Sequence, residues 1–505
     1  MTSAGQLLGI ERLVTGIEGF DLLAEGGLPK GRTILVSGTS GSGKTVLAVQ
    51  FLAEGIMKAG EPGVFVAFEE APADICRNMV SFGWDLMKWQ EEGMLAFVDA
   101  SPEPEQDCVV AGAYDLGALL ARVENAVNKV GAKRVALDSL GAVYARSIDH
   151  GTLRSDIFRL TMALKNLGVT SLITAERTQE YGDIARFGVE EFVVDNVVVL
   201  RNILESGKRR RTMEILKLRG AGHQKGEYSF TITPGAGVLT IPLSVLDPKK
   251  RATGDRITSG NQVLDQMCGG GYFRDSVILV SGATGTGKTL TVTEFLAGGA
   301  ANGGRCLMVA FEESREQVFR NAIGWGVDFE RMERDGRLMV LCRYPETAGL
   351  EDHLVTIRET INEFKPDRVA VDSLSALERV ATAREFGAFV VGLTSFIMSR
   401  GVTGLLTATT FALVDSTSVT MTHVSTINDT IILLRYVEVY GEMHRGITVL
   451  KMRGSAHDKQ IRQFSIDGSG MHIGRPYRNV TGILTGSSIC ARPAEAERIG
   501  ELSGE

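Results

Sequence analysis

A glycine-rich octapeptide occurs twice in this chain of 505 residues, and each time it closes a short apolar run. GTSGSGKT at 38–45 follows TILVS, and GATGTGKT at 282–289 follows VILVS. A G-x-x-x-x-G-K-[ST] loop between a strand and a helix lets backbone N–H groups surround a phosphate at the positive end of the helix. Two such loops in the expected context predict two nucleotide-binding domains.

Much of the remaining sequence is duplicated as well. The matching pairs are VFVAFEE at 64–70 with LMVAFEE at 307–313, RVALDSLGAV at 134–143 with RVAVDSLSAL at 368–377, and KLRG at 217–220 with KMRG at 451–454. The offset is 244 residues at the glycine loops and 234 for the last two pairs. We expect the halves to align without gaps from the aspartate of the DSL motif to the K-x-R-G motif.

The repeat sets the domain organisation. We expect a first domain over 8–245, a linker over 246–260, a second domain over 261–476, and a terminal loop and tail over 477–505. The linker range contains LDPKKRATGDRITSG, which is rich in charged and small residues. Within each domain, apolar strands alternate with helical segments, which is typical of α/β domains with a mostly parallel sheet covered by helices on both faces.

Composition narrows the class of protein. The net charge is −7, and the only basic runs are KRRR at 208–211 and KKR at 249–251, so nucleic acid is not the predicted partner. The six cysteines have no C-x-x-C spacing and the seven histidines no metal-binding spacing, which favours reduced thiols in the cytoplasm. No apolar run approaches the roughly 20 residues of a membrane span, and no signal peptide is recognisable.

The loops supply the candidate ATP-binding residues. The lysines would reach the β- and γ-phosphate oxygens, and the threonine after each lysine would offer its hydroxyl to Mg²⁺. The candidates are Gly41, Ser42, Gly43, Lys44 and Thr45 in the first copy, and Thr284, Gly285, Thr286, Gly287, Lys288 and Thr289 in the second.

Carboxylates follow other strands of each copy. Asp138 and Asp372 end apolar strands, where a carboxylate can position Mg²⁺, although such an aspartate can also cap a helix. The pairs Glu69–Glu70 and Glu312–Glu313 also follow strands. A carboxylate there can activate a water or a hydroxyl for attack on the γ-phosphate, while the alternative is a favourable interaction with a helix dipole.

The K-x-R-G motifs place two cations on one face of a strand-like stretch. Surface cations on strands are usually only solvated, but the transition state of γ-phosphoryl transfer attracts positive charge that a neighbouring subunit can supply. We predict that Lys217, Arg219, Lys451 and Arg453 contact ATP of a neighbour in an oligomeric ring. His223 is a further candidate contact.

The copies differ within their matching segments EEFVVDNVVVLR at 190–201 and VSTINDTIILLR at 424–435. Ser425 falls on Glu191 and Thr426 on Phe192, so only the second copy has hydroxyls there. Loops and strand edges commonly contain such residues. The alternative is that the second copy phosphorylates itself at this pair.

The motifs SGATGTGKT, VDSLSAL, HVSTINDT and YGEMHRGITVLKMRGSAHDK resemble the KaiC family of bacterial clock systems, from about 16 to about 488. This resemblance implies two RecA-like domains. In the family that the chain resembles, the first domain is a slow ATPase that drives hexamer assembly and binds KaiB. The second is an autokinase and autophosphatase that acts across subunit interfaces.

The same resemblance implies roles for individual residues. Ser425 and Thr426 would accept phosphate, Glu312 would be the base beside Glu313, and Arg379 would lie at the interface. Glu69 and Glu70 would activate water in the first domain. Regulation by a KaiA-like activator at 477–488 stays open, since the remaining tail has little similarity to the KaiA-binding tail. An output histidine kinase is a further possible partner.

Two alternatives belong to other classes. A DNA-dependent ATPase related to RecA or to replicative helicases would have the same loops, but it would require basic DNA-facing segments. An ATP-dependent scaffold with a silent second domain would not require Lys288, Thr289, Glu312 and Asp372 all to be present.

Overall fold

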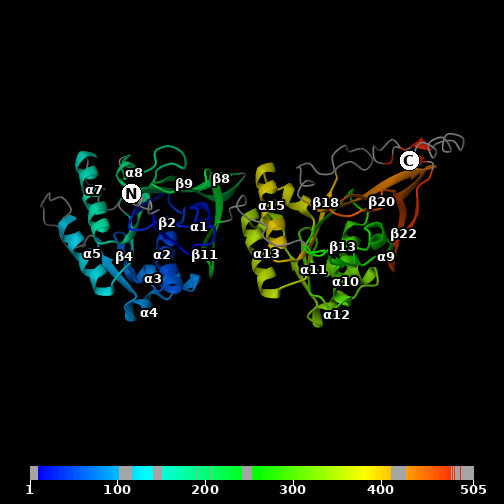
Figure 1. The fold of residues 1–505 in the computed structure, drawn as a ribbon, viewed down its shortest axis with the longest axis horizontal. Helices are drawn as coiled ribbons and strands as arrows, with labels where there is room; N and C mark the ends of the chain where they lie inside the picture. The colour runs from blue at the N-terminus through cyan, green and yellow to red at the C-terminus, as the bar shows by residue number, and fades with distance from the viewer. Residues whose placement is uncertain are drawn as a thin grey trace, which may run out of the picture. The chain divides into compact units, whose positions relative to one another are not determined.

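The computed structural model describes residues 10–101, 116–139, 141, 150–188, 190–205, 207–240, 253–410, 428–478, 480–481, 483 and 489–490. Ser425, Thr426 and most of the predicted tail lie outside the described residues. The chain divides into two compact units, 1–245 and 246–505, and each is described by itself (Figure 1).

The first unit is built on a nine-stranded sheet with the order β11-β10-β9-β8-β3-β7-β6-β4-β5. The strands from β8 to β5 run parallel, and β9 to β11 add an antiparallel extension. Their bounds are β3 Thr33–Gly38, β4 Gly63–Ala67, β5 Leu95–Asp99, β6 Arg134–Asp138, β7 Thr170–Glu176, β8 Asn196–Glu205, β9 Lys208–Leu218, β10 Glu227–Thr233 and β11 Gly237–Thr240. A small pair, β1 Arg12–Leu13 and β2 Leu28–Pro29, precedes them.

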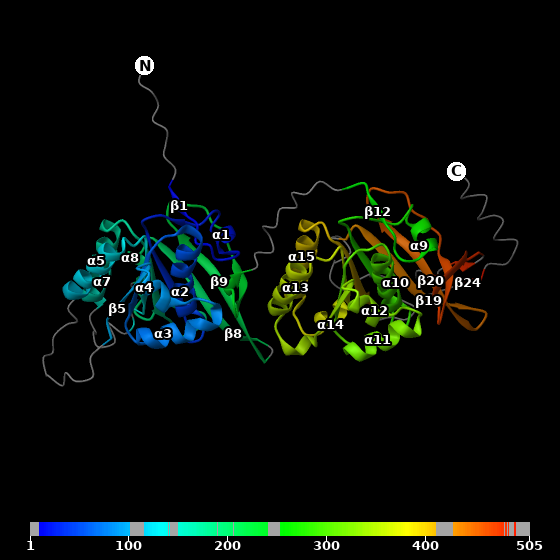
Figure 2. The same cartoon turned by 90° about the horizontal axis from the view of Figure 1, so that it is seen from below.

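Helices cover both faces of this sheet. One buried cluster joins the sheet to α2, α3 and α4, and a second joins it to α5 and α7; α5 and α7 lie side by side in both ribbon views (Figures 1 and 2). The helices are α1 Phe20–Leu23, α2 Lys44–Glu54 with a π-helical turn Gly55–Ala59, α3 Pro72–Met79, α4 Leu86–Glu91, α5 Leu116–Val130, α7 His150–Asn166 and α8 Glu190–Val193.

The second unit repeats this plan with the order β16-β15-β17-β18-β14-β19-β20-β21-β22. Its strands are β12 Arg256–Ile257, β13 Tyr272–Phe273, β14 Val277–Gly282, β15 Cys306–Ala310, β16 Leu338–Cys342, β17 Arg368–Asp372, β18 Thr403–Thr409, β19 Thr430–Val439, β20 Glu442–Met452, β21 Arg462–Asp467, β22 Gly470–Pro476, β23 Val480–Thr481 and β24 Ile489–Cys490. Its helices are α9 Gln262–Met267, α10 Lys288–Ala301, α11 Arg315–Gly324, α12 Phe329–Arg334, α13 Leu350–Phe364, α14 Leu374–Glu378 and α15 Ala383–Ser399. The predicted α/β architecture with two tandem, mostly parallel sheets is confirmed.

One strand of the second unit lies inside the range that the sequence analysis gave to the linker. β12 pairs with β13, and Ser259 just after it is 1% exposed. Arg368 of β17 donates a hydrogen bond to the carbonyl of Thr258 at 2.9 Å. The segment from 256 onward is therefore packed into the second unit.

The strand registers show that the expected gap-free alignment is wrong. Gly38 faces Glu176 across β3 and β7, whereas the equivalent Gly282 faces Thr409, which gives an offset of 233 for β7 and β18. At β8 and β19 the offset is again 234, since Ile34 faces Asn196 and Ile278 faces Thr430. Connections between strands tolerate length changes that the buried strand registers do not. The alignment of Ser425 with Glu191 in the sequence lies close to β8, where the offset is 234 residues.

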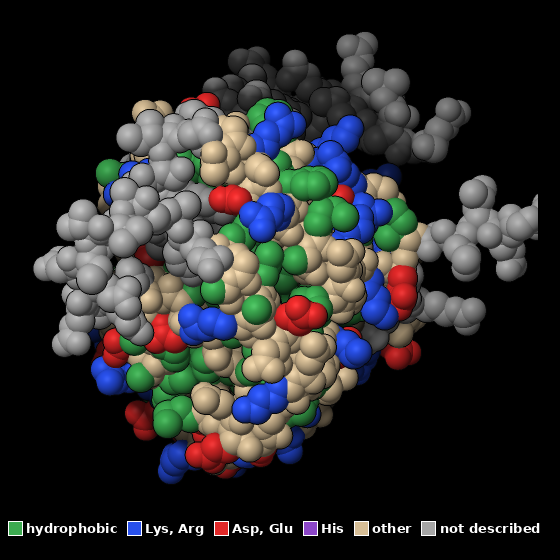
Figure 3. All heavy atoms as spheres, turned by 90° about the vertical axis from the view of Figure 1, so that its left-hand side faces the viewer, with side chains coloured by type: hydrophobic (Ala, Val, Ile, Leu, Met, Phe, Trp, Pro, Cys, Tyr) green, Lys and Arg blue, Asp and Glu red, His purple; other side chains and the backbone are tan. Residues whose placement is uncertain are grey.

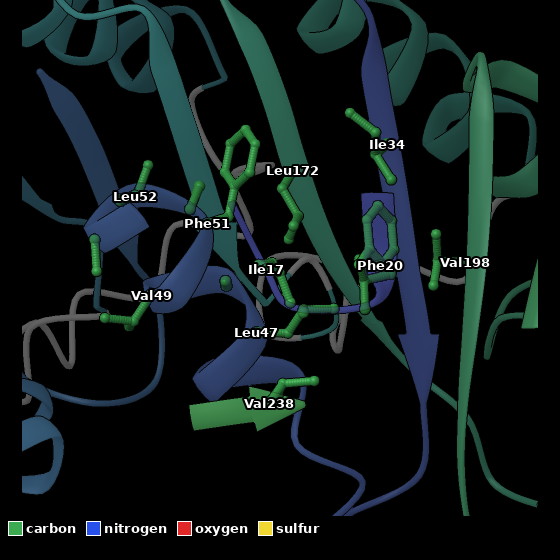
Figure 4. Close-up of a cluster of buried hydrophobic side chains, with 14 of the residues drawn as sticks. Ile17, Phe20, Ile34, Leu47, Val49, Phe51, Leu52, Leu172, Val198 and Val238 are labelled. Atoms are coloured by element: carbon green, nitrogen blue, oxygen red, sulfur yellow. The ribbon is translucent and has the colours of Figure 1, made fainter. Parts of the chain in front are cut away.

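A buried cluster holds α2, and with it the glycine loop, against the sheet. Leu47 and Phe51 of α2 pack with Ile34 of β3 and Leu172 of β7, and all four are at most 3% exposed (Figure 4). Each buried side chain of this kind contributes roughly 1.5–3 kcal/mol relative to an exposed position. This packing therefore fixes the position of α2, which begins at Lys44 of the glycine loop.

The surface of the first unit carries mixed charge on the face drawn in Figure 3. Lys and Arg side chains are interspersed there with Asp, Glu and uncharged side chains, a pattern typical of a solvated surface. Among the described helices, none is long and apolar enough to cross a membrane.

Candidate nucleotide sites

In the first unit the glycine loop turns from the end of β3 into the start of α2. Gly41 and Gly43 have φ of +73° and +97°, a region that glycine enters without steric cost. The ammonium of Lys44 donates to the carbonyls of Gly38 and Thr39, both at 2.9 Å. Burial lowers the pKa of Lys44, and nearby carboxylates, with Asp138 first, oppose that shift.

The second loop has the same geometry between β14 and α10. Gly285 and Gly287 have φ of +79° and +107°, and Lys288 donates to the carbonyls of Gly282 at 2.9 Å and Ala283 at 3.0 Å. Burial lowers the pKa of Lys288 as well. The remaining loop residues differ in exposure: Ser42 and Thr286 are buried, whereas Thr284 is exposed.

A threonine and an aspartate meet beside each loop. Thr45 donates to Asp138 at 2.6 Å, and Thr289 donates to Asp372 at 2.7 Å. The second oxygen of each aspartate accepts a hydrogen bond from a threonine of the neighbouring strand, Thr174 for Asp138 and Thr407 for Asp372.

This donor set fits Mg²⁺. Mg²⁺ prefers oxygen ligands and usually takes one or two from the protein, with waters and phosphate oxygens completing the octahedron. The hydroxyl and carboxylate supply two oxygens, and the described residues contain no group of three His, Cys, Asp or Glu that could hold a metal. Burial raises the pKa of Asp372, opposed by hydrogen bonds from Thr407 and Thr289.

The two acids of the first Glu–Glu pair have different neighbours. Glu69 accepts a hydrogen bond from Ser139 at 3.3 Å, and Ser139 directly follows Asp138 in the chain. Glu70 accepts one from Asn78 of α3 at 2.5 Å. Burial, followed by the charge of Glu176, raises the pKa of Glu69. Glu69 is therefore the acid of this pair that faces the site.

The second pair repeats this division. Glu312 accepts from Ser373 at 3.0 Å and forms an ion pair with Arg379 at 2.6 Å. Glu313 accepts from Asn321 of α11 at 3.3 Å through each oxygen, and burial raises its pKa. Arg379 thus contacts Glu312 within its own chain.

Glu176 is a site residue that the sequence analysis missed. It ends β7 directly opposite Gly38, and its charge acts on both Glu69 and Lys44. The signal was available, because Glu176 ends the apolar run TSLITAE at 170–176 and the carboxyl ends of parallel strands meet at one edge of the sheet. The second unit has Thr409 at this place.

Replacing Glu176 by glutamine is expected to shift the acid limb of ATP hydrolysis to lower pH. If ionised Glu69 activates water, activity is lost as pH falls through its raised pKa, and removing one cause of that shift lowers the pH of the loss. Steady-state hydrolysis between about pH 4 and 8 measures the limb. Thr409→Val is the matched control, with no expected shift. An unchanged limb in Glu176→Gln would contradict this coupling.

The cations of the first K-x-R-G motif lie away from their own glycine loop. Leu218 faces Asn196, which faces Ile34 near the start of β3, so Lys217 and Arg219 lie at the amino end of β3. The glycine loop lies at the carboxyl end of β3. The two ends of this six-residue strand are about 16 Å apart. The structure does not bring these cations to the loop of the same unit.

Each K-x-R-G pair is held by backbone carbonyls and one aspartate. Lys217 donates to the carbonyls of Glu191 and Val194 at 3.1 and 2.8 Å, and Arg219 lies 3.7 Å from Asp195. His223 follows in the partly buried connection to β10.

The second motif has the same local contacts. Lys451 donates to the carbonyl of Asn428 at 2.8 Å, and Arg453 lies 3.9 Å from Asp429. Asp429 and Arg453 also border a hollow of about 380 Å³. Both arginines are about half exposed, at 53% and 56% of the side chain, so a neighbouring molecule can reach them.

Comparison with known proteins gives a consistent result over both units. A family model described as "ATPase: KaiC" matches residues 13–244 and 257–477. A circadian clock protein KaiC3 from Synechocystis sp. is 61% identical over 98% of each chain. Circadian clock oscillator proteins KaiC from Acaryochloris marina and Rippkaea orientalis are 53% and 55% identical over 95% of this chain and 91% and 92% of theirs. With both units matched by one family model and relatives this similar along nearly the whole length, the chain belongs to the KaiC family of ATPases, and it binds nucleotide.

Proposed function

We propose that the first unit hydrolyses Mg-ATP and that the second transfers the γ-phosphoryl group to Ser425 and Thr426. The observation that carries this proposal is the pair of nucleotide sites with matching lysine, threonine–aspartate and glutamate geometry, of which only the second lies in a copy with hydroxyls at the position of Glu191 and Phe192.

In the first site, Glu69 would take a proton from the attacking water, with Glu70 beside it. The raised pKa of Glu69 makes it a stronger base than an ordinary glutamate. Thr45 and Asp138 would hold Mg²⁺, which when bound neutralises charge on the phosphates. Lys44 would leave the loop carbonyls for the phosphate oxygens.

In the second site, Glu312 would accept the proton from the hydroxyl of Ser425 or Thr426. The hydroxyl oxygen forms a bond to the γ-phosphorus as the bond to the bridging oxygen breaks, and ADP leaves. Ser373 and Arg379 each donate to one oxygen of Glu312, and each of these oxygens keeps a second lone pair that can accept the proton. Thr289 and Asp372 would hold Mg²⁺ here.

The ATP sites would lie between subunits of a homo-hexameric ring. Support comes from the K-x-R-G cations, which lie at the far end of the central strand from their own loop. Lys217 and Arg219, with His223, would serve a neighbour's first site, and Lys451 and Arg453 a neighbour's second site. A ring is the closed assembly that such head-to-tail contacts produce.

The clock context suggests partners by analogy with the family. We propose a cytoplasmic protein that binds a KaiB-like protein through the first unit and signals to an output histidine kinase. A KaiA-like activator acting at 477–488 is a further candidate partner, since the chain is similar to proteins named circadian clock oscillator proteins over 95% of its length.

The matched variants Glu69→Gln and Glu312→Gln test the division of labour. With γ-labelled ATP, Glu69→Gln is expected to lose most release of inorganic phosphate while label still enters the protein. Glu312→Gln should do the reverse. A loss of 10²–10⁴-fold is typical when a general base is removed. The division is refuted if both variants lower both products equally while size-exclusion chromatography shows intact rings.

A further inference from the structure

A carboxylate that the sequence analysis did not assign to the site accepts a hydrogen bond from the first glycine loop. Glu180 lies in the segment 177–188 that follows β7. Its Oε1 accepts a hydrogen bond from the hydroxyl of Thr39 at 2.7 Å, and its Oε2 accepts the backbone N–H of Asn202 at 2.9 Å. Both oxygens of the carboxylate are therefore occupied by donors.

The segment that carries Glu180 is itself firmly anchored. Arg177, which is 7% exposed, donates to the carbonyls of Asp183 and Gly182 at 2.9 and 3.1 Å. Arg201 donates to the carbonyl of Glu180 at 3.2 Å and lies over the ring of Tyr181 at 5.1 Å. Because the segment is fixed, Glu180 can fix Thr39.

Glu180 holds the part of the loop next to the phosphate-binding lysine. The carbonyl of Thr39 accepts Lys44, while its hydroxyl donates to Glu180. Two residues further on, the carbonyl of Gly41 accepts a hydrogen bond from Arg211 of β9 at 3.2 Å. The loop is thus held at two points, through the hydroxyl of Thr39 and the carbonyl of Gly41.

The second copy has lost both partners of this contact together. Ala283 stands at the place of Thr39, and the offsets of 233 and 234 put Leu413 or Val414 at the place of Glu180. No hydroxyl–carboxylate bond can form between these residue types. The tether is a property of the first copy.

We propose that Glu180 is a positioning residue of the first nucleotide site, which preorganises the phosphate loop through Thr39 for binding the phosphates of Mg-ATP. This rests on the proposed function, in that the first site must bind nucleotide. A loop already held in its bound shape loses less conformational entropy on binding. The repulsion between Glu180 and the phosphates is partly offset by the positive charge of Arg177, which interacts electrostatically with Glu180.

A double-mutant cycle on the full chain tests the tether. In a Lys288→Ala background, which removes the second site, binding of Mg-ADP is measured by calorimetry for Thr39→Ala, Glu180→Ala and the double variant. Each single change is expected to weaken binding about tenfold, the loss of roughly one charge-assisted hydrogen bond. The double variant should bind Mg-ADP no more weakly than either single variant, because both single changes break the same contact.

Three controls separate the possible outcomes. Asp183→Ala removes an exposed carboxylate of the same segment and should leave binding unchanged, and thermal unfolding checks the fold of every variant. In steady-state hydrolysis the KM should rise about tenfold with little change in kcat. If the effects of the two single changes on Mg-ADP binding are additive, absent or opposite to those expected, the tether is refuted and the proposed function is not affected. If the Lys288→Ala chain binds no Mg-ADP at all, the proposed function fails and the tether with it.

Discussion

Arg453→Ala is expected to lower phosphorylation of the chain by about 10³-fold, with ATP hydrolysis at the first site retained. An arginine supplied across an interface stabilises the charge of the γ-phosphoryl transition state and contributes roughly 10³–10⁵ in rate. Arg453 is half exposed and lies at the far end of the central strand from its own loop. Label transfer from γ-labelled ATP measures the loss.

The matched variant Arg219→Ala should do the opposite, lowering phosphate release while leaving phosphorylation in place. Complementation then shows whether Arg453 acts between subunits. In a 1:1 mixture of Arg453→Ala and Glu312→Gln chains, about a quarter of interfaces pair an intact Glu312 with an intact Arg453. Recovery of activity to about that fraction supports action in trans, and no recovery after subunit exchange contradicts it.

Asp372→Asn should abolish Mg²⁺-dependent phosphorylation, with a loss of at least about 100-fold. The amide keeps the shape of the side chain and can still accept the hydrogen bond from Thr289, but it cannot offer a charged oxygen to Mg²⁺. A Mg²⁺ titration of label transfer measures the effect.

Asp367→Asn is a suitable control for that change, because Asp367 is exposed just before the same strand and accepts the backbone N–H of Arg305 at 2.8 Å. Asp138→Asn is the counterpart in the first site and should affect hydrolysis. Wild-type phosphorylation by Asp372→Asn at ordinary Mg²⁺ concentrations would remove the aspartate from the metal site.

Sequence patterns predicted the parts of this protein that depend on local order along the chain. The glycine loops could be recognised because strand, loop and helix are consecutive, and the duplication showed that the match was not accidental. The strand-end aspartates followed from the same logic, since parallel strands present their carboxyl ends at one edge. In the structure Asp138 accepts the hydroxyl of Thr45, and Asp372 accepts the hydroxyl of Thr289.

Contacts between distant segments could not be predicted in this way. Glu180 reaches Thr39 across 141 positions and Arg379 reaches Glu312 across 67, and neither distance leaves a periodic signal in the sequence. The one-residue shift between β7 and β18, by contrast, is visible in the sequence, where GVTSLITA at 168–175 and GVTGLLTA at 401–408 differ by 233 positions. Glu176 was missed although it ends an apolar run of the sequence, TSLITAE at 170–176.

The most direct test of the account is peptide mass spectrometry of the purified chain after incubation with Mg-ATP. We predict that the peptide containing Ser425 and Thr426 gains about 80 or 160 Da, for one or two phosphates, and that Glu312→Gln prevents this gain while hydrolysis continues. An unmodified peptide in the wild-type chain, with ATP still consumed and with a KaiA-like activator also present, would contradict the proposal that the second unit is an autokinase.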